Sequence, residues 1–197
     1  MKLRPLLLAS LAATLHLGAV EIVFDSPAFE IAKTSGGTAL TSAYTFALGS
    51  FTSITPTAGN RATWEANFNT VPVGGTTVWD EGFTQFSGSA TLSSNAGAFA
   101  TTQQAYIWGY NTLTIGGSTQ WILFTNPSWL FPNSATDTTS WSLADTGTVT
   151  VLGTLNAIGN DPYFSTAPAS AVPEPSTYAA GLGALALLGV ALRRRFV

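Results

Sequence analysis

The chain has 197 residues, of which 9% are charged and 46% are hydrophobic, and its formal net charge is −3. This length accommodates one ordinary domain with short appendages. The stretch 20–171 has two cations against nine carboxylates, which gives it a net charge of −7. Such an acidic stretch has no electrostatic footprint for nucleic acid or anionic lipid, so we expect no nucleic-acid partner. The chain has no cysteine, which excludes disulfides, thiol catalysis and cysteine–metal sites.

The N-terminus has the three-part layout of a secretory signal peptide. Two cations precede a Leu- and Ala-rich run over residues 6–17, and the small residues Gly18 and Ala19 follow it. The apolar run is too short for a comfortable membrane span. We predict a signal peptide over residues 1–19 that is cleaved after Ala19, with an uncleaved anchor as the alternative.

A β-rich exported domain is predicted over residues 20–167. In Leu40–Leu48, every second residue falls on the same face, and this period of two is typical of a strand. Aromatic, Thr, Val and Ile residues gather in several further short segments, with glycine-rich turn signals between them. The further strands that we expect are Ile22–Phe24 and Thr76–Trp79, both as edge strands, and Phe83–Leu92, Ala105–Tyr110, Gln120–Thr125, Trp141–Leu143 and Thr148–Leu155.

A short helix is expected at Asn60–Phe68, where Asn60 would cap the first turn and Trp64 and Phe68 would share one face. Longer helical periods, which an α/β fold would need between its strands, do not occur. The sequence therefore predicts an all-β fold, an antiparallel β-sandwich or a jelly-roll-like domain.

The C-terminus has the organisation of a membrane anchor. Three prolines make residues 168–175 an extended Pro-rich linker. Residues 176–192 carry no charge and would span roughly 26 Å as a helix, which is just enough for one transmembrane helix across a thin hydrocarbon core. The tail 193–197 contains Arg193, Arg194 and Arg195, which should stop transfer and stay in the cytoplasm. A plain tail anchor on a Pro-rich stalk is the alternative.

The sequence Val172-Pro173-Glu174-Pro175-Ser176, followed by a Gly/Ala/Leu helix and an arginine cluster, resembles the PEP-CTERM sorting signal. Such tails occur on proteins of Gram-negative bacteria that produce exopolysaccharide. The resemblance implies recognition by an exosortase, a membrane-embedded transpeptidase-like protease that processes its substrates near the Pro-Glu-Pro motif.

This resemblance implies a route for the chain. We expect it to be exported, to be membrane-anchored through the C-terminal helix before processing, and then to reach the cell surface or extracellular matrix. Its expected partners are the exosortase, the membrane and exopolysaccharide. The segments Phe46–Phe51, Tyr106–Tyr110 and Trp121–Trp129 also resemble segments of uncharacterised β-rich surface proteins with the same tail, a likeness that implies no activity.

The inventory of reactive side chains argues against an enzyme. The only histidine, His16, lies within the predicted signal peptide, so histidine-based triads and histidine-ligated metal sites are excluded from the exported part. A carboxylate pair such as Glu65 and Glu81 is the minimum for glycoside hydrolysis. Glu81, however, lies in a predicted turn, where acids are usually solvated. We therefore predict no catalytic residue and no enzymatic activity.

Two weaker binding sites remain as hypotheses. Calcium prefers hard oxygen ligands, which Asp137 and Asp161 offer beside other polar residues, although ordinary turn residues explain the same pattern. We predict no other cofactor. Trp108 and Trp129 are candidates for stacking on sugars, although most tryptophans in such a domain belong to the core. Trp129 follows Asn126-Pro127 out of the predicted strand and is the aromatic residue that we expect to be exposed.

We therefore predict a non-enzymatic cell-surface or extracellular-matrix protein associated with exopolysaccharide. A carbohydrate-binding module is the alternative, and a hydrolase is the third hypothesis. An exposed row of aromatic residues would favour the module, whereas two carboxylates facing each other across a cleft would favour the hydrolase.

Overall fold

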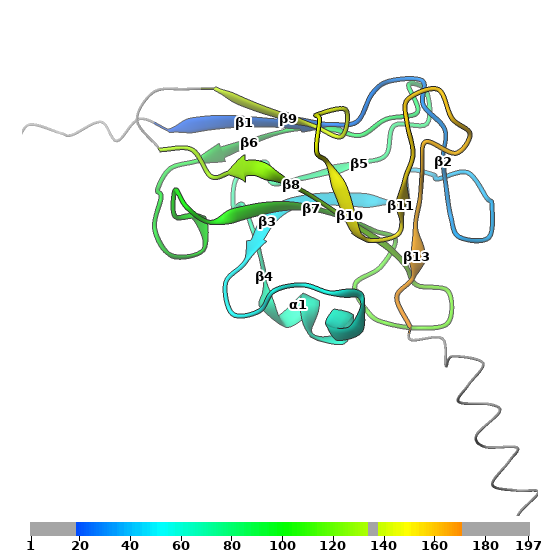
Figure 1. The fold of residues 1–197 in the computed structure, drawn as a ribbon, viewed down its shortest axis with the longest axis horizontal. Coiled ribbons are helices and arrows are strands. Elements are labelled where there is room, and N and C mark those ends of the chain that lie inside the picture. The colour runs from blue at the N-terminus through cyan, green and yellow to red at the C-terminus, as the bar shows by residue number, and fades with distance from the viewer. Residues whose placement is uncertain (1–18, 134–137, 171–197) are drawn as a thin grey trace, which may run out of the picture.

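The computed structural model describes residues 19–133 and 138–170, which are drawn in colour in Figure 1. The predicted transmembrane helix at 176–192, the arginine tail, Asp137 and all but the last residue of the predicted signal peptide lie outside the described residues. The described part is β-rich, with one short α-helix, and its sheets are open. The predicted β-rich character of the exported domain is thus confirmed.

The largest sheet has seven strands and is antiparallel throughout. Along its main path the strand order is β10-β8-β7-β3-β4, while β5 pairs with β3 and β13 pairs with β8. The bounds are β3 (Thr45–Phe51), β4 (Phe68–Thr70), β5 (Thr76–Val78), β7 (Gln104–Tyr110), β8 (Gln120–Leu130), β10 (Val149–Leu152) and β13 (Ala167–Pro168).

Two three-stranded sheets complete the β structure. One has the order β6-β1-β9, and the other has the order β11-β12-β2. Their bounds are β1 (Val20–Asp25), β2 (Ala32–Lys33), β6 (Ser87–Leu92), β9 (Thr139–Ser142), β11 (Thr154–Leu155) and β12 (Phe164–Ser165). Strand β1 pairs with β9 in parallel, and so does β12 with β2, so the prediction of a wholly antiparallel fold is wrong there. Strands this short have the same hydrophobic pattern in either orientation, so the sequence could not distinguish the two.

The central strands of the seven-stranded sheet, β3, β7 and β8, are buried on both faces. Figure 1 shows the β6-β1-β9 sheet on one side of it and the helical segment on the other. On β7, Ile107 belongs to the large core beneath the β6-β1-β9 sheet, whereas its neighbour Trp108 belongs to a second, smaller core. Because successive side chains of a strand point to opposite faces, each central strand contributes to both cores.

The second core is covered by the 3-10 helix η1 (Ala58–Thr63) and the helix α1 (Trp64–Asn67). Thr57 is the N-cap: its hydroxyl accepts a hydrogen bond from the amide of Asn60, and the Asn60 side chain accepts one from the Thr57 amide. Thr57 and Asn60 therefore form a capping box in which Asn60 is the N3 residue, and the prediction that Asn60 is the N-cap is wrong. Trp64 and Phe68 both pack in this core, as the i, i+4 spacing predicted.

Several predicted strands begin or end elsewhere. Residues 41–44 of the predicted strand Leu40–Leu48 form a turn, in which the Tyr44 amide donates to the Thr41 carbonyl oxygen, and β3 runs from Thr45 to Phe51 instead. All residues of β3 after Thr45 are buried, as in a strand covered on both faces. Such a strand lacks the alternation of apolar and polar residues, so this alternation could not locate its ends. Ile22–Phe24 lies within β1, which is the central strand of its sheet and not an edge strand.

Turn chemistry accounts for two further differences. The predicted strand Phe83–Leu92 begins only at Ser87, because the Asp80 carboxylate accepts hydrogen bonds from the amides of Gly82 and Phe83 and closes a turn. The predicted strand Thr148–Leu155 is divided at Gly153, whose positive φ of 87° favours glycine.

Candidate functional site

Arg61 attaches the C-terminal end of the described chain to the domain. Its guanidinium donates hydrogen bonds from Nε to the carbonyl oxygen of Ala169 at 2.7 Å and from Nη2 to that of Ser170 at 2.9 Å. The amide of Ala169 in turn donates to the carbonyl oxygen of Thr119 at 2.9 Å. Pro168, which we predicted to begin the linker, lies in β13 and pairs with β8. The chain thus remains bound to the folded domain as far as Ser170.

A small recess opens on the same side of the large sheet, above the second core. Its volume is about 70 Å³. The lining side chains come from β3, α1, β4, β7 and the loop after β7, and they are Ala47, Glu65, Phe68, Thr70, Trp108, Tyr110 and Leu113. Glu65 is the one charged residue of this lining. Burial raises the pKa of the Tyr110 phenol above its usual value, so its hydroxyl stays protonated at neutral pH.

Trp108 is one of three aromatic residues in the lining of this recess and is itself almost fully buried. Four other rings pack around it at centroid distances of 4.8 to 5.9 Å, and they belong to Trp64, Phe68, Tyr110 and Trp121. The indole nitrogens of Trp64 and Trp121 donate to Asn60 Oδ1 and to the Thr112 carbonyl oxygen, respectively. By contrast, Trp108 Nε1 is buried and has no acceptor among the described residues.

The two tryptophans proposed for sugar stacking are both only 1% exposed, so neither offers a ring face. The prediction that Trp129 is exposed is wrong. Strand β8 continues past Asn126 through a register shift opposite β7, and it carries Trp129 back into the large core. There Trp129 Nε1 donates to an Asp145 carboxylate oxygen at 3.0 Å.

The irregular stretch of β8 is stabilised by side-chain amides. Gln104 Nε2 donates to the carbonyl oxygens of Asn126 and Trp129, while Asn126 Nδ2 donates to the Thr146 carbonyl oxygen and to Thr148 Oγ1. These bonds satisfy backbone groups that a regular ladder would have paired. The prediction that the chain leaves the strand at Asn126-Pro127 is therefore wrong, because β8 continues through this irregular stretch to Leu130.

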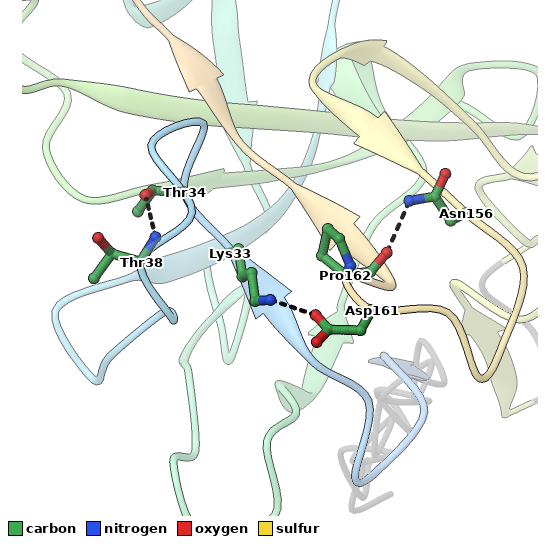
Figure 2. Close-up of polar contacts among 6 residues, drawn as sticks. All are labelled: Lys33, Thr34, Thr38, Asn156, Asp161 and Pro162. Carbon is green, nitrogen blue, oxygen red and sulfur yellow. Dashed lines mark hydrogen bonds and ion pairs between the residues drawn. The ribbon is translucent and has the colours of Figure 1, made fainter.

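Asp161, the second calcium candidate, forms an ion pair with Lys33. Figure 2 shows this pair beside the hydrogen bond from Asn156 Nδ2 to the Pro162 carbonyl oxygen. Within residues 19–133 and 138–170, no three His, Cys, Asp or Glu side chains gather in a group that could hold a metal ion. Because a lysine ammonium occupies the Asp161 carboxylate, the structure offers no support for a calcium site at this residue.

The two carboxylates considered for hydrolysis have separate environments. Glu65 lies at the recess, whereas Glu81 accepts a hydrogen bond from the amide of Ser42 at 2.7 Å and is absent from the recess lining. That bond lowers the pKa of Glu81 below its usual value, which keeps it ionised rather than poised as an acid. Another groove, lined by Pro72, Val73, Thr91, Leu92, Ser93, Ser94, Ala96 and Phe99, has no charged lining residue.

A comparison with family models gave one match, over residues 171–195. The matched range begins directly after Ser170, whose carbonyl oxygen accepts a hydrogen bond from Arg61. The chain carries a PEP-CTERM protein-sorting motif. This confirms the resemblance noted from the sequence, since the matched range contains both the Pro-Glu-Pro residues and the arginine cluster. No match was found among curated proteins or among solved structures.

The PEP-CTERM motif defines what is established about this chain. It is the signal that an exosortase recognises, and it implies export, anchoring at the C-terminus before processing, and sorting to the surface. In the part of the chain that the structure describes, no helix has the length and apolar character needed to span a membrane. The PEP-CTERM motif begins one residue after Ser170, so the Arg61 contacts lie immediately before it.

Two features could not be predicted from the sequence, namely the contacts of Arg61 with the C-terminal segment and the recess beside Trp108. Their residues come together over long sequence separations, since Arg61 contacts Ala169 and the recess joins residues 47 to 113. The one available signal was that Arg61 is one of only two cations in the acidic domain.

Proposed function

We propose that this chain is a non-enzymatic protein of the cell surface or extracellular matrix that associates with exopolysaccharide. The PEP-CTERM motif is the observation that carries the proposal, because it directs the chain to the envelope of the cell. The domain that it delivers is acidic, rich in buried aromatic residues and devoid of histidine and cysteine. These properties favour a structural or binding role over hydrolysis or redox chemistry.

The route can be tested with reporters fused to the full-length chain. A reporter after Val197 should be active in the cytoplasm, and one inserted after Ala171 should be active outside it, because the arginine cluster should remain inside. The opposite orientation would overturn the predicted anchoring.

The association can be tested in an exosortase-bearing strain that makes exopolysaccharide. The processed protein should fractionate with the polysaccharide layer. It should be released into the medium when the genes for polysaccharide synthesis are deleted. Equal retention with and without polysaccharide would contradict the association while leaving the sorting route intact.

A carbohydrate-binding module is the second candidate, and the recess at Trp108 is the observation that favours it. The exposed aromatic residues Phe29 and Phe83 do not form a flat platform, since their rings are tilted by 59°. Binding would therefore depend on contacts with the other side chains that line the recess rather than on stacking against an exposed ring. A hydrolase receives no comparable support, because the recess holds one carboxylate and not two.

A further inference from the structure

Residues 167–170, which precede the PEP-CTERM motif, are held against the domain by three kinds of contact. Strand β13, the last strand in Figure 1, pairs with β8. Ala169 is 1% exposed in the second core, and its amide donates to the Thr119 carbonyl oxygen. Arg61 donates to the carbonyl oxygens of Ala169 and Ser170. We call these contacts of residues 167–170 the C-terminal clamp.

The C-terminal clamp ends close to the Pro-Glu-Pro residues. Only Ala171 and Val172 separate Ser170 from Pro173 in the sequence. An extended chain spans at most about 3.3–3.6 Å per residue, so the Cα of Glu174 lies no more than about 14 Å from that of Ser170. A domain of about 150 residues has a radius of gyration of about 15 Å. An exosortase therefore has to engage Pro-Glu-Pro within about one domain radius of the clamped residue.

The clamp also occupies the backbone groups that such an enzyme would use. Extended peptides commonly bind to proteins as added strands, through their backbone amides and carbonyl oxygens. The Ala169 amide and the carbonyl oxygens of Ala169 and Ser170 already have partners in the domain. A binding cleft that extends more than two residues ahead of Pro173 would compete with β8 and Arg61 for these groups.

We propose that Arg61 is a positioning residue for processing, because it holds the segment before the sorting motif in a clamp that has to open before an exosortase can bind its substrate fully. When only a fraction of a protein is competent to bind, its apparent affinity falls by that fraction. The clamp therefore slows processing of the folded chain. This step is separate from the proposed association with exopolysaccharide, so either can fail without the other.

The test follows conversion of the full-length precursor by pulse-labelling and immunoprecipitation in an exosortase-bearing strain. Arg61→Ala should raise the first-order rate of conversion by about fivefold or more, because the loss of two charged hydrogen bonds favours the open clamp. A role of Arg61 in stability alone would not accelerate processing beyond the effect of an equally destabilising substitution elsewhere.

A spacer and a matched control separate clamp opening from loss of stability. Insertion of Gly-Ser-Gly-Ser between Ser170 and Ala171 lengthens the chain ahead of the motif and leaves both Arg61 and residues 171–195 intact. It should raise the rate as Arg61→Ala does, and should add little to that variant, because both relieve the same restraint. Gly109→Ala crowds the large core, whereas the clamp lies at the second core, so this control should leave the rate unchanged.

The opposite perturbation closes the clamp covalently. Gln120 and Pro168 are cross-strand partners, and such partners have a Cα separation that suits a disulfide. The chain has no cysteine of its own, so the double variant Gln120→Cys with Pro168→Cys contains a single pair, which can oxidise outside the cytoplasm. Its oxidised form should be processed more slowly than the wild type, and a reducing agent should restore the rate relative to wild type treated alike.

Three results would overturn the inference. Arg61→Ala and the spacer variant could both be processed at the wild-type rate or more slowly, which would show that the clamp does not restrain processing. Gly109→Ala could accelerate processing as much as Arg61→Ala, which would show that global unfolding sets the rate. The oxidised disulfide variant could be processed as fast as its reduced form. If Arg61→Ala is too unstable to accumulate, the spacer variant decides alone, since it leaves every contact of the clamp in place.

Discussion

Replacing Arg61 by alanine should release the end of the chain that precedes the sorting motif. The guanidinium makes three hydrogen bonds to carbonyl oxygens, two to Ala169 and Ser170 and one from Nη1 to Ala58 at 3.0 Å. The first two join residues more than a hundred positions apart in the sequence, with separations of 108 and 109. They therefore hold the last strand, β13, and the residues after it against the domain.

The size of the effect follows from the number and exposure of these bonds. A hydrogen bond from a charged group contributes about 1.5–3 kcal/mol when it is well buried. Arg61 is only partly buried, so water replaces part of each bond, and we expect Arg61→Ala to lower the free energy of unfolding by about 1–3 kcal/mol. In a domain of this size each kcal/mol changes Tm by about 2–4 °C, so Tm should fall by about 2–12 °C.

Thermal unfolding followed by circular dichroism measures the global effect, and amide hydrogen exchange locates it. The Ala169 amide should exchange faster relative to the β7 amides, because the C-terminal segment would open before the sheet. Lys33→Met is the control, since its ion pair with Asp161 is largely exposed and should contribute about 0–1 kcal/mol. An Arg61→Ala variant with unchanged Tm and an equally protected Ala169 amide would refute the reasoning.

Three further predictions concern the tail, the packing and the pH response. Glu174→Ala should make full-length precursor accumulate in the membrane of an exosortase-bearing strain, visible by immunoblotting, because it removes the carboxylate of the Pro-Glu-Pro segment. Gly109→Ala should lower the free energy of unfolding in urea by about 1–3 kcal/mol. Its Cβ would lie 2.6 Å from Phe46 Cε1 and 2.8 Å from Ile122 Cγ2. Burial, with a smaller effect from nearby carboxylates, raises the pKa of Tyr163 from 10.0 to about 12. The part of the stability that is linked to the neutral Tyr163 phenol should therefore be fully present below about pH 10 and should be lost progressively between pH 10 and 12, measured as a fall of the urea midpoint with pH.

Each of these predictions has a contrary result. Processing of Glu174→Ala at the normal rate would show that the carboxylate is incidental to recognition. The control for Gly109→Ala is Gly117→Ala, since nothing lies within 4 Å of the added Cβ there; equal midpoints for the two variants would contradict the packing argument. A urea midpoint that stays constant from pH 10 to 12 would show that ionisation of Tyr163 is not coupled to unfolding.

The sequence predicted the central strands well, since β7 begins one residue before its predicted start and β8 begins where expected. Alternate residues of a strand point to the same face, so Trp108 and Tyr110 share one face of β7, and Trp121 and Leu123 share one face of β8. Each pair lies together at the second core. These successes share a cause, because β7 and β8 contain dense runs of aromatic and β-branched residues, which are typical of strands buried on both faces.

The remaining elements depended on interactions between distant residues. Strands β2 and β12 have two residues each, which is too short for any period, and they exist because they pair with each other. The burial of Trp129 depended on Gln104, whose side chain bonds to the irregular part of β8. The recess likewise depends on how five separate segments meet, so no local pattern could have indicated it.

The topology has a consequence for the order of folding in an exported chain. Strand β1 lies near the N-terminus, yet it cannot pair with β6 until residue 92 has crossed the membrane, or with β9 until residue 142 has crossed. The contact of Ala169 with Thr119 can form only later still. Such non-local pairing folds slowly and leaves strand edges open to other chains meanwhile. The chain would therefore leave the translocation channel unfolded. The seven-stranded sheet would be complete only when β13, just before the sorting tail, has crossed the membrane. A membrane anchor would keep neighbouring chains apart during this time, and so would limit pairing between the strands of different chains.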